Sequence, residues 1–246
     1  MSIQASMTWL GHAAIRLTLP DERVVLIDPW LRDNPSCPEG MKDPPRCDFL
    51  VFTHGHSDHT GDAAHLIERH NPRVVAAVEL CALLGMDSPK ARFSPMNIGG
   101  TQTIDGVTFS MTRAFHSSSI DGKNGPLYAG MPAGVVVRVP GLAGFYHAGD
   151  TDVFSDMRLI AELFQPRIAA LPIGDHFTMG PRGAAIATRL LDVRNVVPIH
   201  FGTFPILRGT VAALREALGE ELTDRVVEPR PGQPVTWTVD GLEPVG

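Results

Sequence analysis

The feature that most constrains this chain is a short apolar segment that runs directly into a cluster of histidines. Residues 49–53 read Phe-Leu-Val-Phe-Thr, and residues 54–59 read His-Gly-His-Ser-Asp-His. A nearly continuous apolar run of this length, bounded by polar residues, is typical of a strand that is buried on both faces of its sheet. The sequence therefore predicts a buried strand whose carboxyl end carries three imidazoles and a carboxylate.

The types and spacing of these side chains favour a metal site. Imidazole nitrogens and carboxylate oxygens bind zinc, and catalytic zinc sites keep one position open for water or substrate. The alternative is a polar loop in which Asp58 caps a helix that begins near Thr60. Because one loop cannot complete two metal sites, the metal hypothesis requires further donors elsewhere in the chain.

Three suitable side chains stand where later apolar segments end. His116, Asp150 and His200 each lie at or just beyond the end of a predicted strand. Any one of them could be an ordinary loop residue. Their common position at strand ends indicates a single shared site.

Predicted strands and helices are interspersed through the rest of the chain. Strands are predicted at 7–19 and 23–28, joined by a tight turn, and then at 73–78, 107–114, 134–139, 144–147, 168–173, 195–199, 225–228 and 234–239. Helices are predicted at 62–70, 79–84, 153–164, 182–191 and 209–218. This pattern predicts two sheets packed face to face with helices outside.

Two segments rich in proline and glycine are predicted to lack regular structure. Segment 29–47 contains five prolines, each of which removes a backbone donor and fixes φ. Segment 117–134, directly after His116, is predicted to be a long loop. Such a loop forms a lid or a substrate wall, or is a plain surface excursion.

Length and composition narrow the class of protein. The 246 residues suit one domain, 1–246, and a net charge of −6 disfavours nucleic acid as a partner. There is no apolar run long enough to span a membrane and no secretion signal at the N-terminus, so we expect a cytoplasmic protein. Three cysteines form no disulfide framework and are predicted to be free thiols.

The motifs together resemble the metallo-β-lactamase superfamily, whose pattern is HxHxDH followed by a histidine, a bridging aspartate and a final histidine. Within it, the chain is similar to small metal-dependent hydrolases related to ascorbate-6-phosphate lactonase. That likeness rests on the sequences at 10–12 (LGH), 27–29 (IDP), 172–175 (PIGD), 177–181 (FTMGP) and 200–203 (HFGT). The resemblance covers essentially the whole chain. It implies an α+β fold, a four-layer αββα sandwich of two mixed sheets with helices on the outer faces.

The resemblance also implies a dinuclear centre. The first metal would be held by His54, His56 and His116, the second by Asp58, His59 and His200, and Asp150 would bridge them. Two divalent ions are implied, with Zn²⁺ expected first and Mn²⁺ or Fe²⁺ compatible with the same donors. They would generate a bridging hydroxide near neutral pH from a water that Asp58 would orient or whose proton it would carry.

Three further residues are candidates for roles around the metals or in catalysis, and a fourth is predicted to be structural. The resemblance favours Asp28 as the acceptor of a hydrogen bond from a metal-bound imidazole, against a structural turn before Pro29. His12 and His176 are candidates for protonating the leaving group, against ordinary structural histidines. His147, inside an apolar strand, is predicted to be a hydrogen-bonded core residue.

The expected function is metal-dependent hydrolysis of a small ester, lactone or phosphoester. A phosphodiesterase or nuclease of the same superfamily is one alternative, and it would need a basic track or an added domain. A non-catalytic metal-binding protein is the other, and it would be expected to lose a ligand. The partner expected in every enzymatic case is a small-molecule substrate, and a homo-oligomer is compatible with the sequence.

Overall fold

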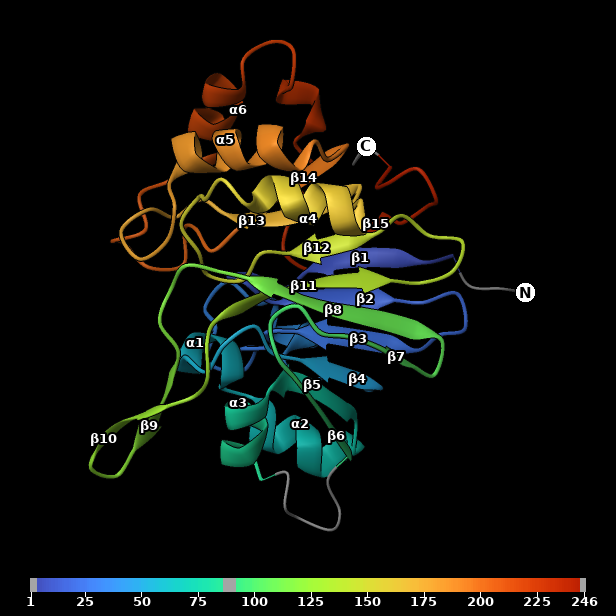
Figure 1. Ribbon diagram of the computed structural model, residues 1–246, viewed down its shortest axis with the longest axis vertical. Coiled ribbons are helices and arrows are strands. Elements are labelled where there is room, and N and C mark those ends of the chain that lie inside the picture. The colour runs from blue at the N-terminus through green and yellow to red at the C-terminus, as the bar shows by residue number, and fades with distance from the viewer. Residues whose placement is uncertain (1–3, 86–91, 244–246) are drawn as a thin grey trace.

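Two sheets face each other in the computed structural model, which describes residues 4–85 and 92–243 (Figure 1). The first has the strand order β15-β1-β2-β3-β4-β5-β6. Its strands are β1 (Ser6–Trp9), β2 (Ile15–Thr18), β3 (Val24–Ile27), β4 (Phe49–Val51), β5 (Arg73–Ala77), β6 (Arg92–Met96) and β15 (Pro234–Thr236). The pairs from β15 to β3 are antiparallel, whereas those from β3 to β6 are parallel.

The second sheet has the order β14-β13-β12-β11-β8-β7. Its strands are β7 (Thr101–Ile104), β8 (Val107–Arg113), β11 (Ala133–Arg138), β12 (Phe145–His147), β13 (Ile168–Pro172) and β14 (Asn195–Ile199). Strands β12, β13 and β14 are parallel, and the remaining pairs are antiparallel. Both sheets are therefore mixed, as predicted.

Helices cover the outer face of each sheet (Figure 1). They are α2 (Ala63–His70) and α3 (Val78–Leu83) on the first sheet, and α4 (Met157–Phe164), α5 (Pro181–Leu191) and α6 (Val211–Leu218) on the second. The alternation of side chains along β11 assigns its two faces. Val135 and Val137 pack into the core between the sheets, whereas Val136 packs against the core beneath α4, α5 and α6. This confirms the predicted four-layer αββα sandwich.

The ends of the parallel strands meet at one edge of the sandwich. β3 and β4 lead into Asp28 and the loop from Thr53 to the short helix α1 (Ser57–Thr60), and β14 leads into His200. In Figure 1, α1 and the loops that follow β13 and β14 lie on the same side, at the left. The polar side chains that follow these strands are thereby brought to one place.

Several predicted elements were wrong in extent. The predicted strand 7–19 is two strands, because Gly11 and His12 have positive φ values of 95° and 52° and reverse the chain. The predicted loop 117–134 contains a hairpin, β9 (Ser119–Gly122) and β10 (Gly125–Tyr128), which projects from the sandwich (Figure 1). The predicted strand 225–228 is reduced to one bridge, between Val226 and Val196, because prolines follow at 229 and 231.

Strands β6 and β7 were not predicted. β6 has a single buried residue, Met96, and β7 has none, so the hydrophobic pattern that identifies a buried strand is absent from both. Within the described ranges, none of the helices has the length and apolar character needed to cross a lipid bilayer.

Candidate metal centre

The site is built around Asp28, a fully buried carboxylate at the end of β3. One of its oxygens accepts a hydrogen bond from the backbone N–H of Thr53 at 2.8 Å. The other accepts bonds from Thr53 Oγ1 at 2.6 Å and from His59 Nδ1 at 2.9 Å. Asp28 therefore fixes both ends of the histidine-rich loop.

These bonds determine which nitrogen of two imidazoles carries the proton. Asp28 can only accept, so His59 Nδ1 is the donor and the Nε2 lone pair of a neutral His59 is free. The hydroxyl of Thr53 donates to Asp28, so its oxygen accepts from His54 Nδ1, which lies at 3.0 Å. His54 Nε2 then carries no proton, and its lone pair is free to bind a metal.

Asp150 lies at the centre of the histidines. Its carboxylate oxygens are 3.0 Å from His200 Nε2, 3.3 Å from His59 Nε2, 3.6 Å from His116 Nε2 and 4.0 Å from His54 Nε2. Only 3% of the Asp150 side chain is exposed. One buried carboxylate thus faces four imidazoles, which come from three loops: His54 and His59 follow β4, His116 follows β8 and His200 follows β14.

Several of these buried atoms have no hydrogen-bond partner among the described residues. They are His59 Nε2, Asp150 Oδ1, and both ring nitrogens of His200; the short contact between His200 and Asp150 is not aligned as a hydrogen bond. Unpartnered buried polar atoms are costly unless something binds them. Neighbouring donors of a tetrahedral zinc ion lie roughly 3.3 Å apart, given bonds of about 2.0–2.1 Å. Three of the four separations around Asp150, 3.0, 3.3 and 3.6 Å, lie near that value, so the residues fit metal ions.

The donors fall into groups of a size that suits one ion each. One group comprises His54, His56 and His116, and another comprises His12, Asp58, His59 and His200; within each, the ligand atoms lie within 4.8 Å of one another. His54 Nε2 and His56 Nδ1 are 3.0 Å apart. All seven residues predicted as metal ligands are therefore brought together, and His12 joins them.

The electrostatics of the site favour positive charge at its centre. Burial alone would raise the pKa of Asp150, but His200 and His59 hold this pKa well below its usual range. Burial alone would lower the pKa of His59, but Asp150 and Asp28 hold it well above its usual range. Burial, together with His59, lowers the pKa of His54 well below 6.5. The buried carboxylates of Asp28 and Asp150 among these imidazoles attract a cation, either a proton on His59 or a metal ion.

His12 lies behind Asp58. Its Nε2 is 3.1 Å from Asp58 Oδ2, its Nδ1 is 3.0 Å from Thr203 Oγ1, and its side chain is 0% exposed. Burial lowers the pKa of His12 to about 4, despite the hydrogen bond to Asp58. Asp58 itself is 29% exposed and is the more open of the two carboxylates among the donors.

The hairpin β9–β10 contacts the histidine-rich loop through hydrogen bonds and close packing. The backbone N–H of Gly55 donates to Ser118 Oγ at 3.2 Å, and Ser118 Oγ donates to the carbonyl of Ala129 at 3.3 Å. A Cβ atom on Gly55 would lie 2.6 Å from Ala129 Cβ. The hairpin, with Tyr128 66% exposed, therefore rises directly beside His54 and His56.

Unusual backbone conformations gather at this edge. Ten non-glycine residues of the described chain have positive φ, and five of them lie on the site loops: His12, Asp28, Asp175, His176 and His200. Such residues persist where the surrounding structure holds them and are common at functional sites. No pattern in the residue spacing indicated these positive φ values.

His176 is not part of the cluster. It is exposed, and with Asp175, Ile206 and Arg208 it lines a cavity of about 330 Å³. His147 is a hydrogen-bonded core residue, as predicted, with contacts to the Ala13 carbonyl at 2.8 Å and the Gly149 N–H at 3.1 Å. The three cysteines are free, also as predicted, and they are buried.

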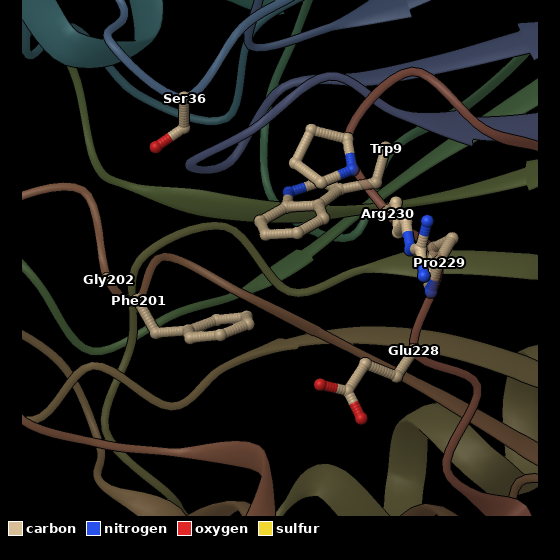
Figure 2. A pocket seen from close by; sticks show the side chains of 8 residues that line it. Trp9, Ser36, Phe201, Gly202, Glu228, Pro229 and Arg230 are labelled. Atoms are coloured by element: carbon tan, nitrogen blue, oxygen red, sulfur yellow. The ribbon is translucent and has the colours of Figure 1, made fainter.

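A second cavity lies behind His200. It has a volume of about 420 Å³ and is lined by the stacked rings of Trp9 and Phe201, together with Ser36, Gly202 and residues 228–231. Figure 2 shows Trp9, Phe201 and Glu228 around this space. The sequence did not indicate this cavity, and it placed Thr203 in the HFGT motif at 200–203 without indicating what its hydroxyl contacts.

Comparison with known proteins agrees with the geometry. Residues 23–201 match the model of the beta-lactamase superfamily domain. The chain is 44% identical over 232 residues to a metal-dependent hydrolase of Koribacter versatilis, covering 94% of this chain and 97% of that protein. It is 40% identical over 230 residues to a metal-dependent hydrolase of Methanosarcina mazei, covering 93% and 97%.

Solved structures show the same fold. Igni18, a metallo-hydrolase from Ignicoccus hospitalis, superimposes with a TM-score of 0.84 at 32% identity, covering 95% of this chain and 98% of that one. An isothiocyanate hydrolase from Delia radicum gut bacteria gives a TM-score of 0.73 at 21% identity, covering 95% and 99%. The second likeness concerns the fold alone.

Proposed function

This chain belongs to the β-lactamase superfamily, and we propose that it is a metal-dependent hydrolase that cleaves a small ester, lactone or phosphoester with two divalent ions. One observation carries the proposal. The buried carboxylate of Asp150 has the Nε2 atoms of four histidines within 4.0 Å. Asp150 Oδ1 and two of these Nε2 atoms, those of His59 and His200, have no hydrogen-bond partner among the described residues, and bound cations would satisfy them.

We assign the donors to two ions by their grouping. His54, His56 and His116 would hold one, Asp58, His59 and His200 the other, and Asp150 would lie between them. Such ions, with zinc first among them, would activate a water nucleophile and polarise the carbonyl or phosphoryl group of a substrate. The likeness to ascorbate-6-phosphate lactonase places lactones among the substrates to be tested.

The protein's own side chains prepare the site. Asp28 and Thr53 hold His54 and His59 in the tautomer whose Nε2 is unprotonated. Burial alone would raise the pKa of Asp58. The hydrogen bond from His12 and the charges of His59 and His12 together outweigh burial, so this pKa lies well below its usual range. Asp58 is thus ionised at neutral pH and able to accept a hydrogen bond from an attacking water.

The proposal is tested on one preparation. The protein is stripped with a chelator, reloaded with Zn²⁺, Mn²⁺ or Fe²⁺, analysed for metal content, and assayed on esters, lactones, thioesters and phosphodiesters. We expect close to two metals per chain and hydrolysis of at least one class. His56→Ala and Asp150→Ala should abolish hydrolysis. The control is His65→Ala, which should not abolish it, because His65 lies on α2 and is paired with Asp43. Two bound metals without turnover on the whole panel would contradict the proposal.

A further inference from the structure

The connection of His12 to both Asp58 and Thr203 is the starting point. His12 is completely buried, so it has no access to a substrate. Each of its ring nitrogens already has a partner, Asp58 Oδ2 at 3.1 Å and Thr203 Oγ1 at 3.0 Å. A histidine in this position is poorly suited to protonate a leaving group.

The partners determine the direction of both hydrogen bonds. The ionised carboxylate of Asp58 can only accept, so His12 Nε2 carries the proton and donates it. The Nδ1 of the neutral ring is then an acceptor, and the hydroxyl of Thr203 donates to it at 3.0 Å in preference to the Phe201 carbonyl, which lies farther away at 3.5 Å. Thr203 therefore selects the tautomer of His12 that is able to hold Asp58.

The backbone of His12 is fixed just as firmly as its ring. Its carbonyl accepts hydrogen bonds from Trp9 Nε1 and from the backbone N–H of His200, both at 2.9 Å. Trp9 stacks on Phe201 with 5.3 Å between ring centroids (Figure 2). His12 is thus tied to the end of β1 and to the residue that follows β14, which itself faces Asp150.

From this geometry we infer that His12 and Thr203 form a relay that positions the Asp58 carboxylate for the second metal ion. His12 is then a positioning residue and not the acid that protonates a leaving group. The inference rests on the proposed function only in taking Asp58, His59 and His200 as the donors of that ion. Partners that hold the ligands of a metal commonly change its affinity about 10–100-fold when they are removed.

His12 also lies close enough to the same donors to be a ligand itself. The two possibilities differ in what a glutamine can replace. The amide N–H of glutamine at position 12 reaches the place of the imidazole Nε2 and can donate to Asp58, but an amide is a poor ligand for zinc. His12→Gln therefore separates positioning from direct ligation.

The test measures zinc binding by equilibrium dialysis with a competing chelator, on the whole chain and without any substrate. Thr203→Val and His12→Leu should weaken the second Zn²⁺ about 10–100-fold and leave the first unchanged. Thr203→Ser and His12→Gln, which keep the donors, should bind both ions nearly as the wild type does. Unfolding temperatures in EDTA report whether each variant is folded.

Two results would overturn the inference. Wild-type affinity of Thr203→Val for both ions, with only its unfolding temperature lowered, would show that the contact is merely structural. Loss of the second ion in His12→Gln as complete as in His12→Leu would show that His12 is a ligand. Because none of these measurements needs turnover, a protein that binds zinc as expected and hydrolyses nothing would refute the proposed function alone.

Discussion

His59 Nδ1 lies 2.9 Å from Asp28 Oδ2, and both side chains are 0% exposed. The same carboxylate oxygen accepts the hydroxyl proton of Thr53, which in turn contacts His54. A single residue at the end of β3 therefore controls the protonation of two imidazoles that follow β4. The parallel pairing of β3 with β4 makes this possible, because it brings the carboxyl ends of both strands side by side.

We predict that Asp28→Asn weakens zinc binding about 10–100-fold. The amide would present N–H groups to donors that now meet a carboxylate, so His59 would move its proton to Nε2 and lose the lone pair that faces Asp150. The buried mismatch should also lower the free energy of unfolding by about 1–3 kcal/mol. Equilibrium dialysis and urea denaturation measure the two effects.

Asp43→Asn is the matched control. It changes a carboxylate that also faces a histidine, His65, at 3.2 Å, but the Asp43 side chain is 50% exposed. Zinc affinity should not change in this variant. Equal losses in the two variants would contradict the role of Asp28.

Gly55→Ala is predicted to disturb the histidine-rich loop, because the new methyl group would collide with the base of the hairpin β9–β10. The new Cβ would lie 2.6 Å from Ala129 Cβ and 3.0 Å from the Ser119 carbonyl oxygen, which is closer than carbon atoms pack. Either the loop or the base of the hairpin must move. We expect lower zinc affinity and a loss of about 1–3 kcal/mol in the free energy of unfolding.

Gly40→Ala controls for the added methyl group, because a Cβ at Gly40 has no atom within 4 Å. It should leave both quantities unchanged. The double variant Gly55→Ala/Ala129→Gly should recover part of the loss, since it removes the shorter of the two contacts. Absence of any recovery would mean that Ala129 is not the obstacle.

Metal removal should destabilise the protein in a way that depends on Asp150. Ligands that bind only the folded state stabilise it by about 2.7 kcal/mol when present at 100 times their dissociation constant. We expect zinc to raise the unfolding temperature of the stripped wild-type protein. In Asp150→Ala, which lacks the carboxylate within 4.0 Å of four imidazoles, zinc should raise it much less.

The sequence allowed the fold to be predicted because most buried strands carry a strong hydrophobic signal. Strands β4 (Phe49–Val51) and β14 (Asn195–Ile199) are buried, as predicted, and lead toward His54 and His200, although β4 ends two residues before the predicted end at Thr53. The two-sheet architecture follows from many such strands interspersed with helices. Strands β6 and β7 lack this pattern of buried apolar residues, and they were not predicted.

The candidate site was predictable as a set of residue types but not as a network. Seven donors stand at or near strand ends, and the structure brings them together. The contacts of Thr203 with His12 and of Gly55 with Ala129 join loops distant in sequence. Gly55 and Thr203 both lie in sequence motifs, HxHxDH at 54–59 and HFGT at 200–203, but only the packing of the two sheets determines these contacts.

The cysteine thiols are predicted to resist modification in the folded protein. Burial raises the pKa of Cys37 to about 11 and that of Cys47 and Cys81 to about 12. At pH 8 only about one thiol in a thousand or fewer would be ionised, and the thiolate is the reactive form. Ellman's reagent should detect none of the three cysteines until guanidinium is added, whereas an exposed Ser155→Cys should react at once.

His147 is expected to make the free energy of unfolding depend on pH. The N–H of Gly149 donates to His147 Nδ1 at 3.1 Å, so Nε2 carries the proton and donates to the Ala13 carbonyl at 2.8 Å. Burial lowers the pKa of His147 in the folded protein below 6.5. Below pH 6.5 the unfolded chain therefore binds a proton that the folded chain does not, and this residue's contribution to stability is lost as pH falls through that window.

His147→Gln removes this titration while an amide can still donate to the Ala13 carbonyl. We expect the free energy of unfolding of the wild type in EDTA to fall more steeply between pH 6.5 and 5 than that of the variant. The difference should reach at most about 1.4 kcal/mol per pH unit, the value for one proton. Urea denaturation at several pH values measures both slopes, and the other histidines contribute equally to each. Parallel slopes would show that His147 takes up no additional proton on unfolding in this range.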